Sequence, residues 1–301
     1  MNSENTKQAP LEETQYTGRT WKNTTAYIVW KQFVRNKAAL IGLVILVLVV
    51  LMAIFAPLLA PYDYMEIDPI HAKMLPNAEH WFGTDEYGRD ILSRILYGSR
   101  YSLLIGICSG ALGCFVGVVL GSLAGFFGGM TETVILRFCD ILQSIPSMLL
   151  SIMISTVLGS SFFATVVALS FYNIPGLARL LRATMMSVRE QEFIEAAKAI
   201  NCSKGRVLIF HLLPNCMAPV IINFSMSIGM RIMSSAGLSF LGLGIQEPMA
   251  EWGAMIASGR KLLRYAPHIV IIPGIFVAVV VLAFNMLGDG LRDALDPKLR
   301  K

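Results

Sequence analysis

The chain has 301 residues, of which 55% are hydrophobic and 15% are charged, and its net charge is +5. Soluble domains carry roughly 25% charged residues, so this composition excludes an ordinary soluble globular protein and indicates a membrane protein with several spans. The cysteines fall in predicted spans or in one inner loop, which predicts packed thiols and no disulfide framework. The histidines are scattered, at His71, His80, His211 and His268, and no metal site is predicted.

The polar N-terminal region divides into two parts. Residues 1–20 are predicted to form a disordered cytoplasmic tail. In residues 21–37 the side chains of Tyr27, Trp30, Phe33 and Val34 fall at helical spacing among lysines and arginines. This pattern predicts an amphipathic interfacial helix on the inner leaflet. A disordered segment is the alternative, and the aromatic pair favours the helix.

Six apolar segments follow, and each is long enough to cross a bilayer. The first, at 38–60, carries no charge and would be about 35 Å long as a helix. The uncharged stretch 141–178 is too long for one span and divides at Gly159-Ser160-Ser161. The predicted spans are therefore 38–60, 101–130, 132–157, 162–180, 214–236 and 268–288.

These spans define the expected domain organisation. An external loop occupies 61–99 and contains a short helix that begins near Thr84, Asp85 and Gly88. A five-span core covers 100–290 and includes an inner loop at 186–213 and an external loop at 237–267. Residues 291–301 form a second cytoplasmic tail.

The distribution of basic residues predicts the orientation. The first 37 residues, the loop 179–206 and the tail after Gly290 together hold 16 lysines and arginines. The opposite loops, 61–99 and 237–267, hold six. By the positive-inside rule both termini and the 179–206 loop are expected in the cytoplasm.

Few charges lie within the spans. Arg137 and Asp140 are three residues apart and are predicted to form a structural pair near the cytoplasmic end of the third span. Arg231 lies in the fifth span, where it either faces a transport pathway or reaches the outer interface. Glycines at spacings of three or four residues in 106–125 predict a helix face that another helix approaches closely.

The inner loop carries the most specific pattern. Residues 179–199 have helix-forming composition, and Asn201 follows at the position where a left-handed residue would end the helix. Ser203 is expected to cap a second helix, which Pro214 kinks as it enters the membrane. Ala196 and Ala197 would keep one face thin enough to seat in a groove, and Glu195 offers a charged anchor. The alternative is a basic loop that lies on the membrane.

At these residues the chain resembles a known family. The order Glu195-Ala196-Ala197, Asn201, Leu213-Pro214-Asn215 is similar to the coupling loop of ABC importer permeases, which usually have glycine where this chain has Asn201. Three further stretches resemble the C-type permease of dipeptide, oligopeptide and nickel importers, so that the likeness covers residues 25–300. They are Phe82-Gly83-Thr84-Asp85-Glu86-Tyr87-Gly88-Arg89-Asp90, Leu238-Ser239-Phe240-Leu241-Gly242-Leu243-Gly244 with Trp252-Gly253-Ala254, and Asn285-Met286-Leu287-Gly288-Asp289-Gly290-Leu291-Arg292-Asp293.

The resemblance implies an all-α membrane protein with the six-helix fold of a type I ABC importer permease, in a bacterial plasma membrane. It implies a paired B-type permease, two ABC ATPase subunits docked on residues 190–213, and an extracytoplasmic substrate-binding protein. ATP and Mg would be bound by the ATPase subunits. We expect no cofactor on this chain, no catalytic residues and no nucleic-acid partner, and the sequence contains no Gly-Lys-Ser/Thr phosphate-binding loop.

The same resemblance suggests roles for individual residues. Glu195, Ala196, Ala197, Asn201, Leu213 and Pro214 would form the ATPase-coupling loop. Pathway or gate candidates are Arg231, Phe240, Leu241, Gly242 and Gly244. Candidates for docking the binding protein are Thr84, Asp85, Gly88, Arg89, Asp90 and Trp252.

The expected cargo is a di- or oligopeptide, and import of nickel or another small solute by the same architecture is the alternative. A second alternative is an ion-coupled secondary transporter, which would need buried acidic or basic residues near the middle of the membrane. A third is a membrane scaffold or receptor subunit, which would not need the inner-loop pattern.

Overall fold

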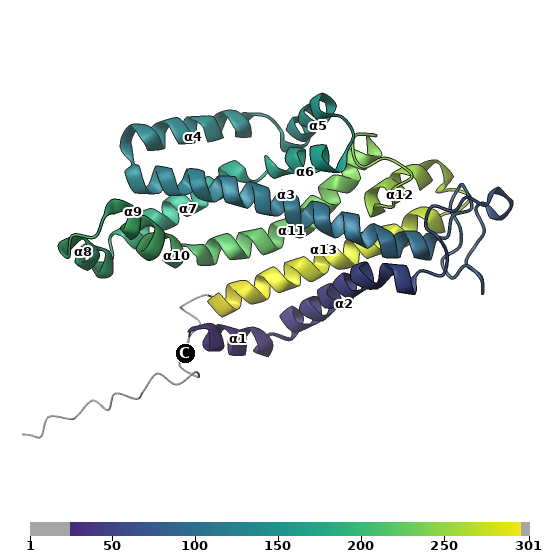
Figure 1. Cartoon of the computed structure of the whole chain (residues 1–301), viewed down its shortest axis with the longest axis horizontal. Coiled ribbons are helices and arrows are strands. Elements are labelled where there is room, and N and C mark those ends of the chain that lie inside the picture. Colours follow the sequence, from purple (N-terminus) through teal and green to yellow (C-terminus); the bar gives the residue numbers. More distant parts are fainter. Residues whose placement is uncertain (1–24, 296–301) are drawn as a thin grey trace, which may run out of the picture.

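The computed structural model describes residues 25–295, and the predicted 1–20 tail and the last six residues lie outside this range. The described chain is all-helical and contains no β-strand (Figure 1). Its helices are α1 (Thr25–Arg35), α2 (Lys37–Leu59), α3 (Ile91–Phe127), α4 (Gly129–Ser144), α5 (Ser147–Leu158), α6 (Phe162–Ser170), α7 (Ile174–Arg189), α8 (Glu192–Ala199), α9 (Lys204–Arg206), α10 (Leu213–Asn215), α11 (Met217–Phe240), α12 (Trp252–Gly259) and α13 (His268–Leu295). Short turns of other helix types are η2 (Pro69–His71), η3 (Val207–Leu212, a π-helix) and η4 (Arg260–Leu262).

Four helices are long and apolar enough to cross a membrane by themselves, namely α2, α3, α11 and α13. The two other predicted spans are broken, because α4 meets α5 at 89° and α6 meets α7 at 42°. Counting each bent pair as one span gives up to six spans in the described chain. The sharper bend has a local cause: Ile145 precedes Pro146 and is extended, as the proline ring requires of the residue before it.

Helix α3 differs from its prediction in length. The sequence suggested a short external helix followed by a span from residue 101, whereas the structure has one helix of 37 residues that begins at Ile91. Arg94 and Arg100, which marked the boundary, do not interrupt it because both are paired. Arg94 lies 3.5 Å from Asp85, and Arg100 donates to the carbonyls of Ala53 and Ile54.

The glycines of α3 are sites of close helix packing. A Cβ atom at Gly113 would lie 2.6 Å from the carbonyl oxygen of Ser170, and one at Gly121 would lie 2.6 Å from that of Ala178. A Cβ at Gly106 would lie 2.8 Å from Ile232 in α11. The absence of side chains therefore lets α6, α7 and α11 approach the α3 backbone.

The core has two main parts that lie toward opposite ends of the long axis in Figure 1. The larger joins α2, α3, α11 and α13 and includes Trp252 of α12. The smaller joins α7, α8, η3 and the start of α11 around Leu181, Ile194 and Leu212. The N-terminal helix α1 packs on α13 through Phe33 and Ala294, so its aromatic pair is divided: Phe33 is buried and Trp30 is exposed.

Candidate functional site

The first candidate site is the α8 hairpin, which comprises residues 190–216 and projects from one end of the molecule (Figure 1). The predicted single helix over 179–199 is two helices, because the chain turns at residues 190–191 between α7 and α8. Asn201 has φ +59°, which is the left-handed conformation expected of it. The amide of Asn201 donates to the carbonyl of Lys198 at 2.9 Å, and that of Cys202 to the carbonyl of Ala197 at 3.1 Å. These two hydrogen bonds form a Schellman motif, which ends α8 and reverses the chain.

Helix α8 has one buried and one exposed face. Ile194 and Ala197 are buried against the smaller core, whereas Glu195 and Ala196 are exposed. Glu195 forms no ion pair with any described residue and is free to meet a partner. Further along the hairpin Leu213 is half-buried and Pro214 is exposed on α10.

The hairpin also exposes apolar side chains that the motif did not identify. Ile200 is 76% exposed and Phe210 is 69% exposed. Phe210 lines a shallow hollow together with Ser203, Arg206 and His211. Exposed large apolar residues beside a free carboxylate are typical of a protein-docking surface. Their signal in the sequence was weak, since apolar residues near a span are expected to be buried in it.

Arg231 occupies the middle of the bundle, between α3, α6 and α11. Its side chain is 2% exposed, and its Nη1 donates to the carbonyls of Leu169 at 3.1 Å and Ser109 at 3.4 Å. It forms no ion pair with any described carboxylate, and its Nε has no hydrogen-bond partner. Arg231 also lines a cavity of about 220 Å³ next to the α4–α5 bend. Arg231 was expected either to face a transport pathway or to reach the outer interface. Because its side chain is buried inside the bundle, it does not reach the outer interface.

The other pathway candidates lie apart from Arg231, at the end of α11. Phe240 and Leu241 are 48% and 47% exposed, and Gly242 turns the chain with φ +77°. Gly244 is buried against Ser239, where a Cβ would lie 2.1 Å from the Ser239 hydroxyl oxygen. Arg260 donates to the Phe240 carbonyl at 2.6 Å and lies over its ring. Phe240, Leu241 and Gly242 border a second hollow together with Arg260. The predicted pathway residues therefore lie in two separate places.

Elsewhere the predicted Arg137–Asp140 pair is present but long, at 3.6 Å. Asp140 also pairs with Arg179 of α7, which ties α4 to α7. Arg179 therefore shares the structural role expected of the Arg137–Asp140 pair. The three-residue spacing within one helix could not identify it, because Arg179 lies on another helix.

The third candidate region, which we call the cap, comprises residues 60–90 and 241–267 at the end opposite the α8 hairpin (Figure 1). Its centre is an ionic network of three buried residues, Asp85, Arg89 and Arg94, with Glu247 at its exposed edge. The Asp85 carboxylate accepts from Arg89 Nε at 2.6 Å, and Arg89 Nη2 donates to Glu247 at 2.8 Å. Arg94 completes the network, with Nε 3.5 Å from Asp85.

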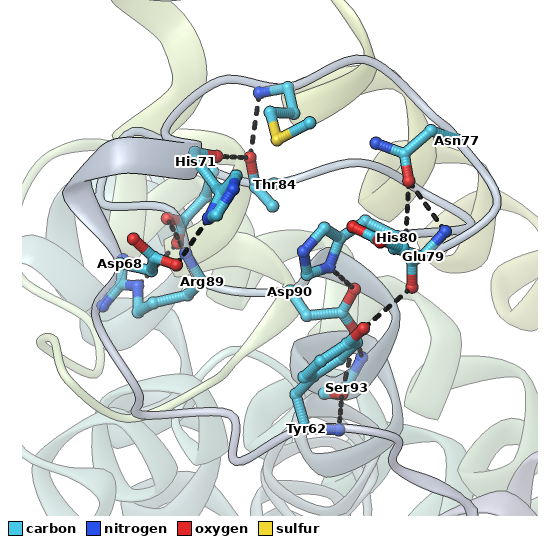
Figure 2. Close-up of polar contacts among 12 residues, drawn as sticks. Tyr62, Asp68, His71, Asn77, Glu79, His80, Thr84, Arg89, Asp90 and Ser93 are labelled. Carbon is cyan, nitrogen blue, oxygen red and sulfur yellow. Dashed lines mark hydrogen bonds and ion pairs between the residues drawn. The ribbon is translucent and has the colours of Figure 1, made fainter.

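Further hydrogen bonds hold the cap loop together and join it to the start of α3 (Figure 2). Thr84 donates its hydroxyl to the His71 carbonyl and accepts from the Met74 amide at 2.9 Å. Asp90 caps α3 by accepting from the Ser93 amide at 2.7 Å, and its other oxygen lies 3.0 Å from His80 Nδ1. Gly88 has φ +82°, and a Cβ there would lie 1.7 Å from the Asp68 carbonyl oxygen, so only glycine fits.

The charges of the cap shift several pKa values. Burial works against the charged form of Arg89, but its hydrogen bonds and ion pairs with Glu247 and Asp85 outweigh this and raise its pKa. Burial raises the pKa of Glu251, which accepts from the Ala254 amide at 2.7 Å and from Ser239 at 3.1 Å. A hydrogen bond to Asp68 raises the pKa of His71, and the same bond lowers the pKa of Asp68.

The predicted docking residues of the cap face inward. Thr84, Asp85, Arg89 and Asp90 are at most 5% exposed. Trp252 is fully buried, and its Nε1 donates to the Ile95 carbonyl at 3.1 Å. These side chains therefore hold the cap together and do not form its surface. The large exposed side chains of the cap are others, among them Ile70, Leu75, Trp81 and Tyr87.

Two partners in the cap were missed by the sequence analysis. Glu247 accepts from Arg89, and Glu251 accepts from Ser102 at 3.3 Å, but each pair is more than 140 positions apart and no pattern in the sequence connects them. The described chain is thus a bundle of up to six spans, two of them broken, with an exposed hairpin at one end and the cap at the other. Comparisons with known proteins identify its family.

Two family models match the chain. The model described as binding-protein-dependent transport system inner membrane component matches residues 117–301. The model of the N-terminal TM domain of oligopeptide transport permease C matches residues 25–77. The chain therefore belongs to the family of binding-protein-dependent transport system inner membrane components, and the resemblance seen in its motifs is confirmed.

Curated relatives agree over nearly the whole length. The dipeptide transport system permease protein DppC of Alkalihalophilus pseudofirmus is 44% identical over 97% of this chain and 95% of its own. The oligopeptide transport system permease protein OppC of Bacillus subtilis is 39% identical over 91% of each chain. The glutathione transport system permease protein GsiD of Pectobacterium atrosepticum is 42% identical over 90% of each.

Solved structures show the same fold. An inward-facing structure of the MetNI methionine ABC transporter superposes with a TM-score of 0.56 at 18% identity, covering 67% of this chain and 97% of that chain. The predicted type I ABC importer permease fold, preceded by an N-terminal helix, is confirmed. The chain is thus an ABC importer permease, a multi-pass inner-membrane component and not the catalytic subunit of its transporter.

Proposed function

We propose that this chain is the permease subunit of an ATP-driven importer of di- or oligopeptides, in which it forms half of the translocation pathway beside a paired B-type permease. The observation that carries the proposal is the α8 hairpin, a rigid projection that exposes Glu195, Ile200 and Phe210. Two ABC ATPase subunits would bind ATP and Mg, and one of them would dock mainly on residues 190–213. This chain would hold no cofactor and contact no nucleic acid.

The packing beneath α8 supports a mechanical role. Ile194 of α8 shares a buried cluster with Leu181 of α7 and Val220 of α11. A close-packed cluster transmits displacement because it has few voids to absorb it. Movement of α8 by an ATPase subunit would therefore shift α7 and α11 together. ATP binding would drive the spans outward-open, and hydrolysis would return them to the inward-open state.

The charge distribution supports an orientation with both termini and the α8 hairpin in the cytoplasm. The cap would then face outward, where an extracytoplasmic binding protein delivers its cargo. The exposed Trp81 and Tyr87 are the side chain types enriched in protein interfaces. Thr84, Asp85, Gly88, Arg89, Asp90 and Trp252 would serve docking indirectly, by holding this surface in shape.

Peptide cargo is supported by the names of the relatives, which are permeases for dipeptides, oligopeptides and glutathione. All three cargoes are peptides with free carboxylates. The test is to purify the tagged chain from detergent-solubilised membranes, identify the proteins that accompany it, and reconstitute the complex in liposomes. We expect a second permease, P-loop ATPases and ATP-dependent uptake of a labelled dipeptide. Uptake by this chain alone without ATP would contradict the proposal.

A further inference from the structure

The cavity beside Arg231 lies where both bent spans break. Its volume is about 220 Å³, and its wall comes from Ser147 and Ser151 of α5, Tyr172 between α6 and α7, and Met230 and Ser234 of α11. The first turn of α5 and the end of α6 therefore meet the middle of α11 at this cavity. In membrane transporters, helices that break within the membrane are the usual walls of a substrate site, because their ends offer polar backbone groups.

The cavity is positively charged without a counter-ion. Arg231 is 2% exposed, and the described residues provide no carboxylate for it. Its Nε has no partner, and its contact with the Ser109 carbonyl, at 3.4 Å, is long for a hydrogen bond. A buried cation in a membrane is costly unless it is paired, so an unpaired one indicates a ligand that completes it.

The start of α5 adds to this charge. Helix α5 has 12 residues, its N-cap is Pro146, and no side chain caps its first amides. Ser147 and Met148 of the first turn line the cavity. The N-terminal end of a helix carries a partial positive charge and free amide donors, which favour an anion.

We propose that this cavity binds a carboxylate of the cargo during its passage, with Arg231 as the charged contact. The inference rests on the proposed function, and it identifies the part of the peptide that the permease itself recognises. The rest of the wall suits varied side chains, since Met148, Met230 and Met233 are flexible and polarisable. These methionines and Tyr172 are 46–57% exposed, so the cavity opens on a face of the chain.

The direct test uses the assembled complex in lipid nanodiscs, without binding protein or ATP. Binding of dialanine and of dialanine amide is measured by ligand-observed NMR titration, for the wild type, Arg231→Gln and Arg231→Lys. Arg137→Gln is the matched control, because it removes a span arginine whose side chain is 78% exposed. We expect the wild type and the control to bind dialanine at least about tenfold more tightly than the amide, as a charge-assisted bond implies.

Arg231→Gln is expected to remove this preference. Arg231→Lys, which keeps the charge but loses the two-pronged geometry, is expected to reduce it and serves if the glutamine variant does not assemble. Absence of a preference in the wild type overturns the inference. So does equal weakening of both ligands by Arg231→Gln, which would mean that the arginine supports the shape of the cavity without contacting the carboxylate. If the wild-type complex shows no ATP-dependent peptide uptake in liposomes, the proposed cargo itself fails, which is a separate result.

Discussion

The two ends of the molecule use their motif residues in opposite ways. In the α8 hairpin Glu195 and Ala196 are exposed, and the turn is made by the backbone around Asn201. In the cap Asp85 and Arg89 are at most 5% exposed and pair with one another. Both sets of residues appear in the sequence as polar motifs between spans, yet only one set is available to a partner.

The difference follows from charge balance. The cap brings two carboxylates, Asp85 and Glu247, to two guanidinium groups, Arg89 and Arg94, so the charges balance. Asp85 and both arginines can therefore be buried, while Glu247 stays partly exposed at the edge. Glu195 has no opposite charge among the described residues and stays in water. A charged motif therefore indicates an outward surface only where the fold supplies no counter-charge.

Replacement of Arg89 by leucine tests whether the cap network is structural. It would leave Asp85 buried without its main partner, and we expect the free energy of unfolding to fall by about 3–5 kcal/mol, toward the lower end because Arg94 remains nearby. Denaturant titration in detergent micelles measures this. The control is Arg264→Leu, which removes an exposed arginine of the same cap. Equal loss of stability in both variants would contradict a structural role of the network.

Gly88→Ala tests the close approach of the cap loop. Gly88 and Gly159 share φ +82°, but a Cβ at Gly88 would strike the Asp68 carbonyl, whereas one at Gly159 would meet nothing within 4 Å. We expect Gly88→Ala to be about 1–3 kcal/mol more destabilising than Gly159→Ala. Thermal unfolding of the two variants separates the clash from the backbone strain that they share. Similar losses would mean that the loop relaxes away from Asp68.

Glu195→Lys tests the opposite end. Because Glu195 is exposed and unpaired, we expect the free energy of unfolding to change by less than about 0.5 kcal/mol. ATP-dependent uptake should nevertheless fall by about tenfold, which corresponds to ~1.4 kcal/mol of lost docking energy. Asp289→Lys, an exposed charge reversal on α13 outside residues 190–213, is the control. Normal coupled uptake by Glu195→Lys would remove the hairpin from the proposed mechanism.

Asn201→Gly tests the turn that ends α8. Asn201 holds φ +59°, which glycine adopts without a steric penalty. We expect a local gain of at most about 1 kcal/mol, because glycine also increases the freedom of the unfolded chain. Hydrogen exchange of the α8 amides should slow slightly. Faster exchange would show that the Asn201 side chain stabilises this turn by more than glycine gains from adopting the left-handed backbone conformation freely.

The smallest effect concerns the exposed His71–Asp68 pair. Its hydrogen bond raises the pKa of His71 and lowers that of Asp68, so the pair stabilises the cap only between the two folded-state pKa values. The contribution is lost as the pH rises through the raised pKa of His71, and also as it falls through the lowered pKa of Asp68. Asp68→Asn should therefore return the His71 pKa toward about 6.5. NMR of labelled histidine measures this, and an unchanged pKa would show that another group is responsible.

Much of the fold was predictable because it depends on properties that are local in the chain. Long apolar segments located α2 to within one residue and α11 to within four, since a bilayer requires a helix of that length and polarity. Helix α13 begins at the predicted residue, but it ends at Leu295 and so includes the first five residues of the predicted 291–301 tail. The turn at Asn201 was also predictable, because few residues accept its conformation. The continuation of α3 through Arg94 was not, because it depends on the carboxylate that pairs with this arginine.

The class of this protein, the number of its apolar segments, and the motifs of its inner and external loops can all be read from the amino-acid sequence. Hydropathy, helical spacing and backbone preference depend only on residues that are close together in the sequence. A single sequence is therefore enough to recognise them. Only the tertiary structure decided which motif residues are exposed. Whether Asp85, Glu195 or Arg231 faces water, a partner or a cavity depends on counter-charges such as Glu247, which lie far away in the chain and meet it only through folding.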